Sequence, residues 1–164
     1  MVAFEIKGVS LNSLSFEDAK KLVFHETLLQ KIYGPDIEVG QWKDGQRTLK
    51  MVMDIPSNVP YELVRFFCGN KIVVTVKQKI KISNKNLHEV KSRVHMHVFG
   101  DDLWKIRPRW TIRMDPRGKP FLDTCVEVST LLPPPLRQIM ERFLLENAEN
   151  DLRKYVATIV SELA

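Results

Sequence analysis

The chain has 164 residues and a net charge of +5. At this length a single domain, 1–164, buries enough apolar surface to fold without disulfide bonds. Its two cysteines, Cys68 and Cys125, lack any CxxC or Cys/His spacing, and no apolar run approaches the roughly 18 residues of a membrane span, which argues against a disulfide framework, a structural zinc site and a transmembrane helix. Because the N-terminus also lacks a secretory signal pattern, we expect a cytoplasmic protein, either fully soluble or peripheral to a membrane.

The N-terminal part predicts a strand followed by two short helices. Residues 3–9 are β-prone, and residues 15–18 resemble a capping box in which the Ser15 hydroxyl caps a helix start. Gly34-Pro35 ends the second helix. The apolar positions of these helices are Leu22, Val23, Leu28, Leu29 and Ile32.

The middle of the chain has the two-residue period of β-strands. Asp44-Gly45 between residues 36–43 and 46–55 predicts a two-residue hairpin, because both central positions need a positive φ. Residues 60–69 are interpreted as one or two helical turns. Three further segments alternate apolar with largely basic residues: 71–82, 87–98 and 103–114. Residues 120–130 are predicted to form a last strand, and short turns join these segments. The pattern predicts an antiparallel meander with one apolar face and one basic face.

The C-terminal part predicts one long helix. Pro133 to Pro135 suit a first helical turn, and from there to Leu163 apolar residues recur every three or four positions. At 1.5 Å per residue such a helix is about 42 Å long, enough to cross a whole sheet. We therefore predict an α+β fold in which residues 134–163 form one helix over the concave face of a six- or seven-stranded antiparallel sheet.

This order of elements resembles the helix-grip fold of the START-like (SRPBCC) superfamily, which includes StAR-related lipid-transfer domains, plant pathogenesis-related allergens, polyketide cyclases and VASt sterol-transfer domains. Residues 40–48, with Trp42 and Arg47, resemble the Trp-then-Arg hairpin of VASt-like domains, and residues 55–78 resemble uncharacterised START-like families. The resemblance implies a cavity between sheet and helix that binds, and in a carrier transports, a lipid or another hydrophobic small molecule. A cyclase-like enzyme that uses the same cavity is the alternative that the resemblance admits.

The apolar face of the predicted sheet supplies the candidate ligand site. Strand alternation and helix spacing direct the following side chains beneath the C-terminal helix: Met51, Met53, Val74, Gln78, Val94, Met96, Trp104, Trp110, Ile112, Phe143 and Tyr155. The alternative is that they form a filled core, and Met suits both interpretations because its flexible thioether fills gaps and adapts to ligands.

Two polar residues interrupt this apolar face. A buried unpaired polar group costs about 1–3 kcal/mol, so Gln78 either bonds a ligand oxygen, pairs within the protein or lies near the open end. Arg47 shares its face with Met51 but adjoins the turn, and we expect its guanidinium to reach solvent rather than to bind a head group.

The opposite face is basic. Between Lys71 and Arg113 eleven Lys and Arg residues stand against three acids. The face comprises Lys77, Lys79, Lys81, Arg93, Lys105, Arg107, Arg109 and Arg113. A solvated outer surface is the leading interpretation, and a contact with an anionic membrane surface or an acidic protein is the alternative. Nucleic acid is disfavoured because no aromatic residues are interleaved for base stacking.

Catalytic and metal-binding patterns are weak. His95 and His97 point the same way on a strand, yet nothing nearby completes a ligand set, so we predict no metal site and no cofactor. The sequence contains no GxSxG, HExxH, glycine-rich phosphate loop or Cys/His pair. Asp123, Cys125 and Glu127 share one face of the last strand, where such residues commonly point outward. We therefore predict a binding protein more readily than an enzyme.

Overall fold

The computed structural model describes residues 2–54, 71–96 and 104–163, without the side chains of Met53, Ser83 and Trp104. Its elements follow the predicted order: β1 (Val2–Ser10), α1 (Phe16–Leu22), α2 (Glu26–Tyr33), β2 (Glu38–Val39), β3 (Gln46–Asp54), β4 (Lys71–Asn84), β5 (Leu87–Met96), β6 (Trp104–Met114), β7 (Pro120–Thr130) and α4 (Leu136–Leu163). The predicted α+β class is confirmed. The helical turns predicted at residues 60–69 lie outside the described residues.

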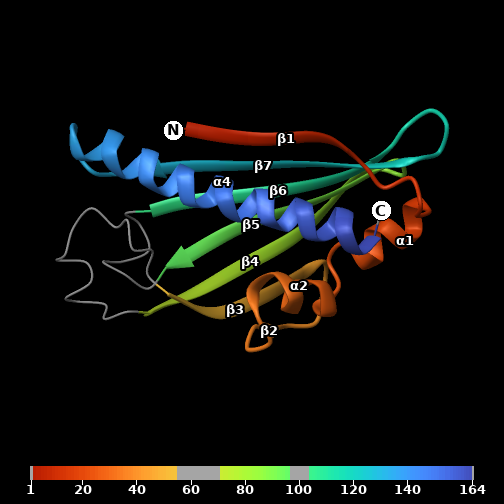
Figure 1. Cartoon of the computed structure of the whole chain (residues 1–164), viewed down its shortest axis with the longest axis horizontal. Helices are drawn as coiled ribbons and strands as arrows, with labels where there is room; N and C mark the ends of the chain where they lie inside the picture. The colour runs from red at the N-terminus through yellow and green to blue at the C-terminus, as the bar shows by residue number, and fades with distance from the viewer. Residues whose placement is uncertain (1, 55–70, 97–103, 164) are drawn as a thin grey trace.

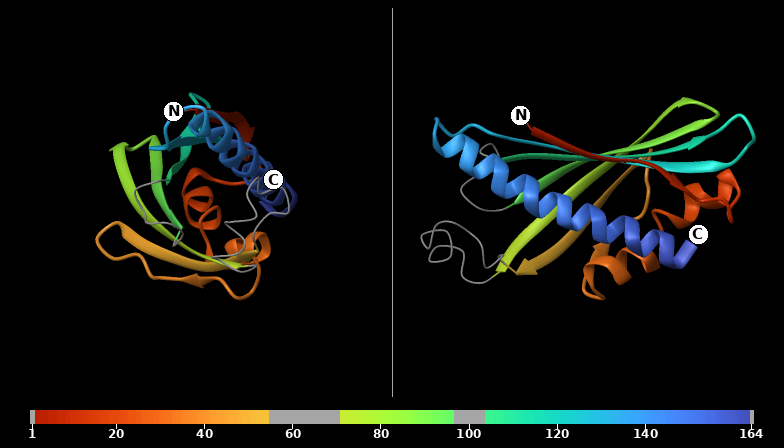
Figure 2. Two further views of the ribbon diagram at one scale, coloured as in Figure 1. Left: turned by 90° about the vertical axis from the view of Figure 1, so that its left-hand side faces the viewer. Right: turned by 45° about the horizontal axis from the view of Figure 1, so that its top comes forward.

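The strands form one antiparallel sheet in the order β1-β7-β6-β5-β4-β3-β2. From β3 to β7 each strand pairs with its neighbour in sequence, as short turns require, while β1 closes the far edge against β7. The sheet curves strongly, and α4 lies along its concave side (Figures 1 and 2). The predicted continuous C-terminal helix is confirmed and begins at Leu136, just after the three prolines.

The hairpin at Asp44-Gly45 has the predicted geometry. Both residues have positive φ, 53° and 72°, and the backbone groups of Lys43 and Gln46 bond each other across the turn at 2.8 and 3.0 Å. The strand predicted at 36–43 is wrong in length: only Glu38–Val39 forms a strand on β3, and Lys43 makes an isolated bridge to Gln46. Beyond β2, Gly40 approaches β3 so closely that a Cβ would lie 2.9 Å from the Thr48 carbonyl oxygen.

The two N-terminal helices are held by caps. The backbone N–H of Asp18 donates to the Ser15 hydroxyl at 3.1 Å, which confirms the predicted cap of α1. His25 caps α2 in the same way, since its Nδ1 accepts from the backbone N–H of Thr27 at 3.1 Å. Gly34, at φ 101°, ends α2.

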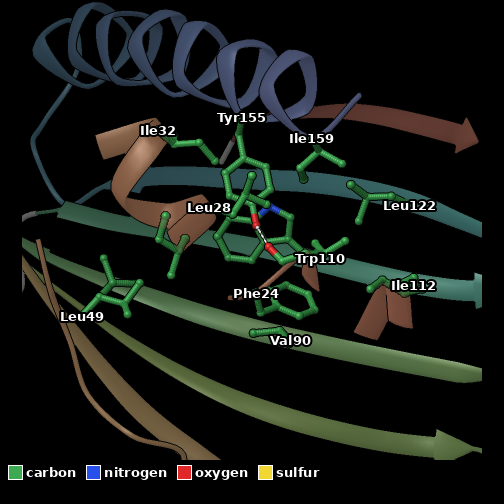
Figure 3. Packing of buried hydrophobic residues seen from close by; sticks show 14 of the residues in the cluster. Phe24, Leu28, Ile32, Leu49, Val90, Trp110, Ile112, Leu122, Tyr155 and Ile159 are labelled. Atoms are coloured by element: carbon green, nitrogen blue, oxygen red, sulfur yellow. Dashed lines mark hydrogen bonds between the residues drawn. The ribbon is translucent and has the colours of Figure 1, made fainter. Parts of the chain in front are cut away.

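One end of the space between α4 and the sheet is filled by packed side chains from α1, α2, the sheet and the last turns of α4 (Figure 3). Phe24, Val90, Ile112, Leu122 and Ile159 are all buried there. The Tyr155 hydroxyl donates to the Val23 carbonyl oxygen at 2.9 Å, and its ring packs on Trp110 with centroids 5.5 Å apart. These contacts fix the C-terminal half of α4 and set the inner limit of the space beneath the rest of the helix.

Candidate functional site: an apolar cavity beneath α4

A cavity of about 410 Å³ lies between α4 and the concave face of the sheet. Its volume falls within the range of small-molecule sites, about 300–1,000 Å³. Its walls come from α2, from β3 to β7 and from α4, so no single element forms it.

The roof of the cavity is one stripe of α4. Its members recur at three- and four-residue intervals, the spacing that puts side chains on one face of a helix. They are Met140, Phe143, Leu144, Asn147, Ala148, Asp151, Leu152 and Tyr155. The sequence prediction named only Phe143 and Tyr155, yet stepping by four between them reaches Asn147 and Asp151. The periodicity therefore contained the signal for the rest of the stripe.

The floor contains most of the predicted sheet residues. Those at the cavity wall are Met51, Val74, Gln78, Val94, Met96 and Trp110. Ile112, predicted to line the site, is not at this cavity wall. It points to the same side as Trp110, but it lies deeper along β6, where α1 packs, and is fully buried in the filled core. The side chains of Met53 and Trp104 lie outside the described residues.

A row of polar side chains crosses the floor on three neighbouring strands. Arg47 pairs with Gln78 in the β3–β4 register, and Gln78 pairs with Ser92 in the β4–β5 register. Arg47 Nε donates to Gln78 Oε1 at 2.6 Å, and Gln78 Nε2 donates to Ser92 Oγ at 3.4 Å. Of these three residues, Gln78 reaches the cavity wall.

The expectation that Arg47 reaches solvent is wrong. Arg47 is only 7% exposed, its Nη1 donates to the Phe24 carbonyl oxygen at 2.9 Å, and its guanidinium stacks on Trp42 at 4.3 Å from the ring centroid. Burial lowers the pKa of Arg47 to about 10. The guanidinium is buried because Phe24, between α1 and α2, and Trp42 lie against it, which strand alternation alone does not reveal.

Acidic groups lie where α2, the end of β3 and α4 meet. Tyr33, Asp54 and Asp151 line the main cavity and also a smaller adjoining depression, which Lys154 borders. Desolvation raises the pKa of Asp151, although Lys154 opposes the shift, and Asp151 is exposed as a residue. Burial, followed by the Asp151 carboxylate, raises the pKa of Tyr33. Sequence reasoning missed this group, because it arises only where three separate elements converge.

The predicted basic residues lie on the convex side of the sheet, away from α4. Lys77, Lys79, Lys81, Arg93, Arg107 and Arg109 are exposed, and Lys105 and Arg113 are half-buried. The register sets like charges opposite each other, as in the pair of Lys77 and Arg93. This arrangement is unfavourable in a sheet. What this face contacts stays a prediction.

Asp123, Cys125 and Glu127 of β7 lie outside the cavity wall. Asp123 has a structural role, because its two oxygens accept from the Gly8 backbone N–H at 2.7 Å and from Arg113 Nε at 2.8 Å. Burial raises the pKa of the Cys125 thiol, which makes it a poor nucleophile. Within 2–54, 71–96 and 104–163, no group of three or more His, Cys, Asp or Glu side chains could hold a metal ion. His97 lies outside these residues.

No protein-family model matches the chain, and no curated protein matches it in sequence. Solved structures do match it. The ZhuI aromatase/cyclase from a Streptomyces species aligns with a TM-score of 0.55 and 12% identity over 95% of this chain and 90% of that chain. Ara h 8.0201 aligns with a TM-score of 0.56 and 14% identity over 98% of this chain and 97% of that chain. Both are helix-grip structures. This chain has the helix-grip fold.

Norcoclaurine synthase from Thalictrum flavum extends the match, with a TM-score of 0.54 and 11% identity over 98% of this chain and 86% of that chain. At such identities these likenesses establish the helix-grip fold alone. The predicted nearness to StAR-related and VASt-like members stays a prediction. Among the helices in the described part of the chain, none is both long and apolar enough to cross a membrane.

Proposed function

We propose that this protein binds a hydrophobic small molecule in the cavity beneath α4. The observation that carries the proposal is a space of about 410 Å³ whose wall is mainly aliphatic and aromatic. Protein interiors are otherwise packed as densely as organic crystals, so an unfilled space of this size forgoes many dispersion contacts. An apolar molecule in the cavity would supply those contacts.

The shape of the cavity wall favours an elongated apolar molecule. From Tyr155 back to Met140 the roof extends about 22 Å along the helix axis, at 1.5 Å per residue. From Trp110 back to Ile106 the floor extends about 13 Å along β6, at about 3.3 Å per residue. A lipid meets this description, and carriage of a lipid between membranes is the further step that the proposal admits.

Native mass spectrometry of the protein, purified without detergent, tests the proposal. We expect a population heavier than the chain alone, and organic extraction followed by mass spectrometry would identify the bound molecule. A second arm titrates N-phenyl-1-naphthylamine, whose fluorescence rises in apolar sites. A protein that carries no bound molecule and leaves the fluorescence of this probe unchanged would remove the proposal.

A cyclase-like enzyme that uses the same cavity is the second candidate. The observation that favours it is Asp151, a carboxyl group at the cavity wall whose pKa is raised by desolvation, as suits a group that exchanges protons with a substrate. Incubating the extracted molecule with the stripped protein separates the two functions. An enzyme converts the molecule to a product, and Asp151→Asn abolishes that conversion while still binding. A carrier returns the molecule unchanged with either protein.

A further inference from the structure

Six basic side chains form two rows on the convex face of the sheet. Each row crosses the adjacent strands β4, β5 and β6, and the rows lie two residues apart along each strand. The first row is Lys77, Arg93 and Arg107, and the second is Lys79, Lys91 and Arg109. All six residues of this basic patch are exposed. With strands about 4.8 Å apart and about 3.3 Å per residue along each strand, their Cα atoms fall within roughly 10 × 7 Å.

Acidic residues of the protein balance only a part of this charge. Glu89 Oε1 lies 3.8 Å from Lys91 Nζ and 3.9 Å from Arg109 Nε. The other four side chains of the patch make no ion pair within the part of the chain that the structure describes. Like charges directly opposite each other destabilise a sheet, and Lys77 stands opposite Arg93. The requirements of folding therefore do not account for the patch.

The basic patch lies on the side of the sheet that the helices leave free. The helices α1, α2 and α4 all lie on the concave side (Figure 2). The residues that alternate with the patch along β4, Val76 and Gln78, are buried on that concave side. The six basic side chains therefore point away from the cavity, and no helix in the described part of the chain covers them.

The composition of the patch distinguishes between kinds of anionic partner. Protein interfaces are depleted of Lys and depend on aromatic or apolar anchors at their centre, and neither row contains such an anchor. A nucleic acid is bound by an element that enters a groove or by aromatic side chains that stack on bases, and these rows offer neither. An anionic lipid bilayer needs no anchor, because it presents many negative head groups in one plane and attracts each Lys or Arg near it. A patch of this small extent meets a planar surface even on a curved sheet.

We propose that the basic patch of β4, β5 and β6 docks this protein on an anionic phospholipid bilayer. Docking on the convex face places α1 and α4 on the side of the sheet away from the bilayer. The inference goes beyond the proposed function and is independent of it, because the patch needs no ligand in the cavity.

Cosedimentation with vesicles tests the docking. Wild type should bind vesicles of phosphatidylcholine with roughly 30% phosphatidylserine, and should bind phosphatidylcholine alone far more weakly. Raising the salt from about 0.05 M to about 0.5 M should release the protein, because salt screens exposed charges. Each basic residue near an anionic surface contributes about fivefold in affinity, so Lys77→Gln/Arg93→Gln should weaken binding about 25-fold.

A matched control removes the same charge from the other side of the sheet. Lys21→Gln/Arg142→Gln takes two positive charges from exposed positions on α1 and α4, and should weaken vesicle binding by less than about twofold. Folding is checked by thermal unfolding. Because Lys77 and Arg93 are like charges opposite each other, Lys77→Gln/Arg93→Gln should unfold at the wild-type Tm or above it.

Lysine footprinting gives a second readout on wild type. Phosphatidylserine-containing vesicles should slow the acetylation of Lys77 and Lys79 by an amine-reactive reagent, and should leave the acetylation of Lys21 unchanged. Mass spectrometry of the digested protein measures the extent of acetylation at each position.

Equal losses of vesicle binding in the two double variants would show that net charge, rather than this patch, binds the vesicles, and would overturn the inference. Acetylation of Lys77 that is unaffected by vesicles would do the same. Poly-L-glutamate and a mixed-sequence duplex DNA represent the other partners. Tighter binding to either of them than to vesicles, at equal concentrations of negative charge, would overturn the choice of a membrane. None of these results bears on the cavity, whose ligand is tested separately.

Discussion

Val94→Trp distinguishes a ligand cavity from a filled core. Val94 lies on the inner face of β5 and at the cavity wall, so the larger indole would extend into a space of about 410 Å³. Val90, four residues earlier on the same strand and face, is 0% exposed and packs in the filled core. Val90→Trp is therefore the matched control, because the chemical change is identical and only the free volume differs.

The expected magnitudes follow from this difference. Overpacking a filled core costs about 1–3 kcal/mol, and for a chain of this size each kcal/mol lowers Tm by about 2–4 °C. Val90→Trp should therefore lower Tm by roughly 2–12 °C. Val94→Trp should lower it by less than about 2 °C, because the cavity accepts the added volume.

The assay combines thermal unfolding with titration of N-phenyl-1-naphthylamine, both on protein stripped of bound molecules. Val94→Trp should lose most of its affinity for the probe, and Val90→Trp should keep it at temperatures where it remains folded. Equal losses of Tm in the two variants, together with unchanged probe binding by Val94→Trp, would show that the space beneath α4 is not available to ligands.

Three further substitutions test the structure around the site. Gly45→Val should cost about 1–2 kcal/mol in urea unfolding, because Gly45 has φ 72° and a β-branched residue resists positive φ; Gly45→Asn should cost clearly less. Tyr155→Phe should lower the free energy of unfolding by about 1–3 kcal/mol, because it leaves the Val23 carbonyl oxygen unpaired. A loss below about 0.5 kcal/mol would contradict that hydrogen bond. Because folding raises the pKa of Asp151, its charged carboxylate destabilises the folded protein above that pKa, and Asp151→Asn should raise Tm near pH 7. The difference in Tm between variant and wild type should shrink as pH falls through the raised pKa toward the ordinary Asp pKa near 3.9. A difference in Tm that is independent of pH would refute the assignment.

The sequence predicted the fold well because each element carries its own local signal. The alternation of β4 to β7, the positive-φ hairpin at Asp44-Gly45 and the long apolar period of α4 are all readable without tertiary information. Where the prediction was wrong, a neighbouring element decided the outcome. The Gly40 N–H bonds the Thr48 carbonyl oxygen of β3 at 2.9 Å although β2 ends at Val39, and Phe24, between α1 and α2, accepts from Arg47.

The site was predictable only in part, because alternation gives the face of a residue but not what packs over it. Val90, Val94 and Ile112 all point inward, yet only Val94 of these three lines the cavity. The partners of polar residues are equally hidden: Gln78 and Arg47 each stood out in the sequence, but their pairing depends on the β3–β4 register. The acidic group at Asp54 and Asp151 requires α2, β3 and α4 to converge.

A cavity rather than a core forms here because α4 is anchored on one side of the curved sheet. Leu144 and Leu152 of α4 pack with Val126 and Val128 of β7, in a cluster that also takes side chains from β1. The C-terminal half of α4 is held by the hydrogen bond from the Tyr155 hydroxyl to the Val23 carbonyl oxygen. The curvature carries β4 and β5 away from this anchored edge, as the end-on view in Figure 2 shows, and one layer of side chains spans only about 10 Å between packed elements. The residues that hold α4 thus differ from most of those that face the cavity from β4 and β5. We therefore expect substitutions at floor positions such as Val74 and Val94 to alter which ligand binds, with little effect on the fold.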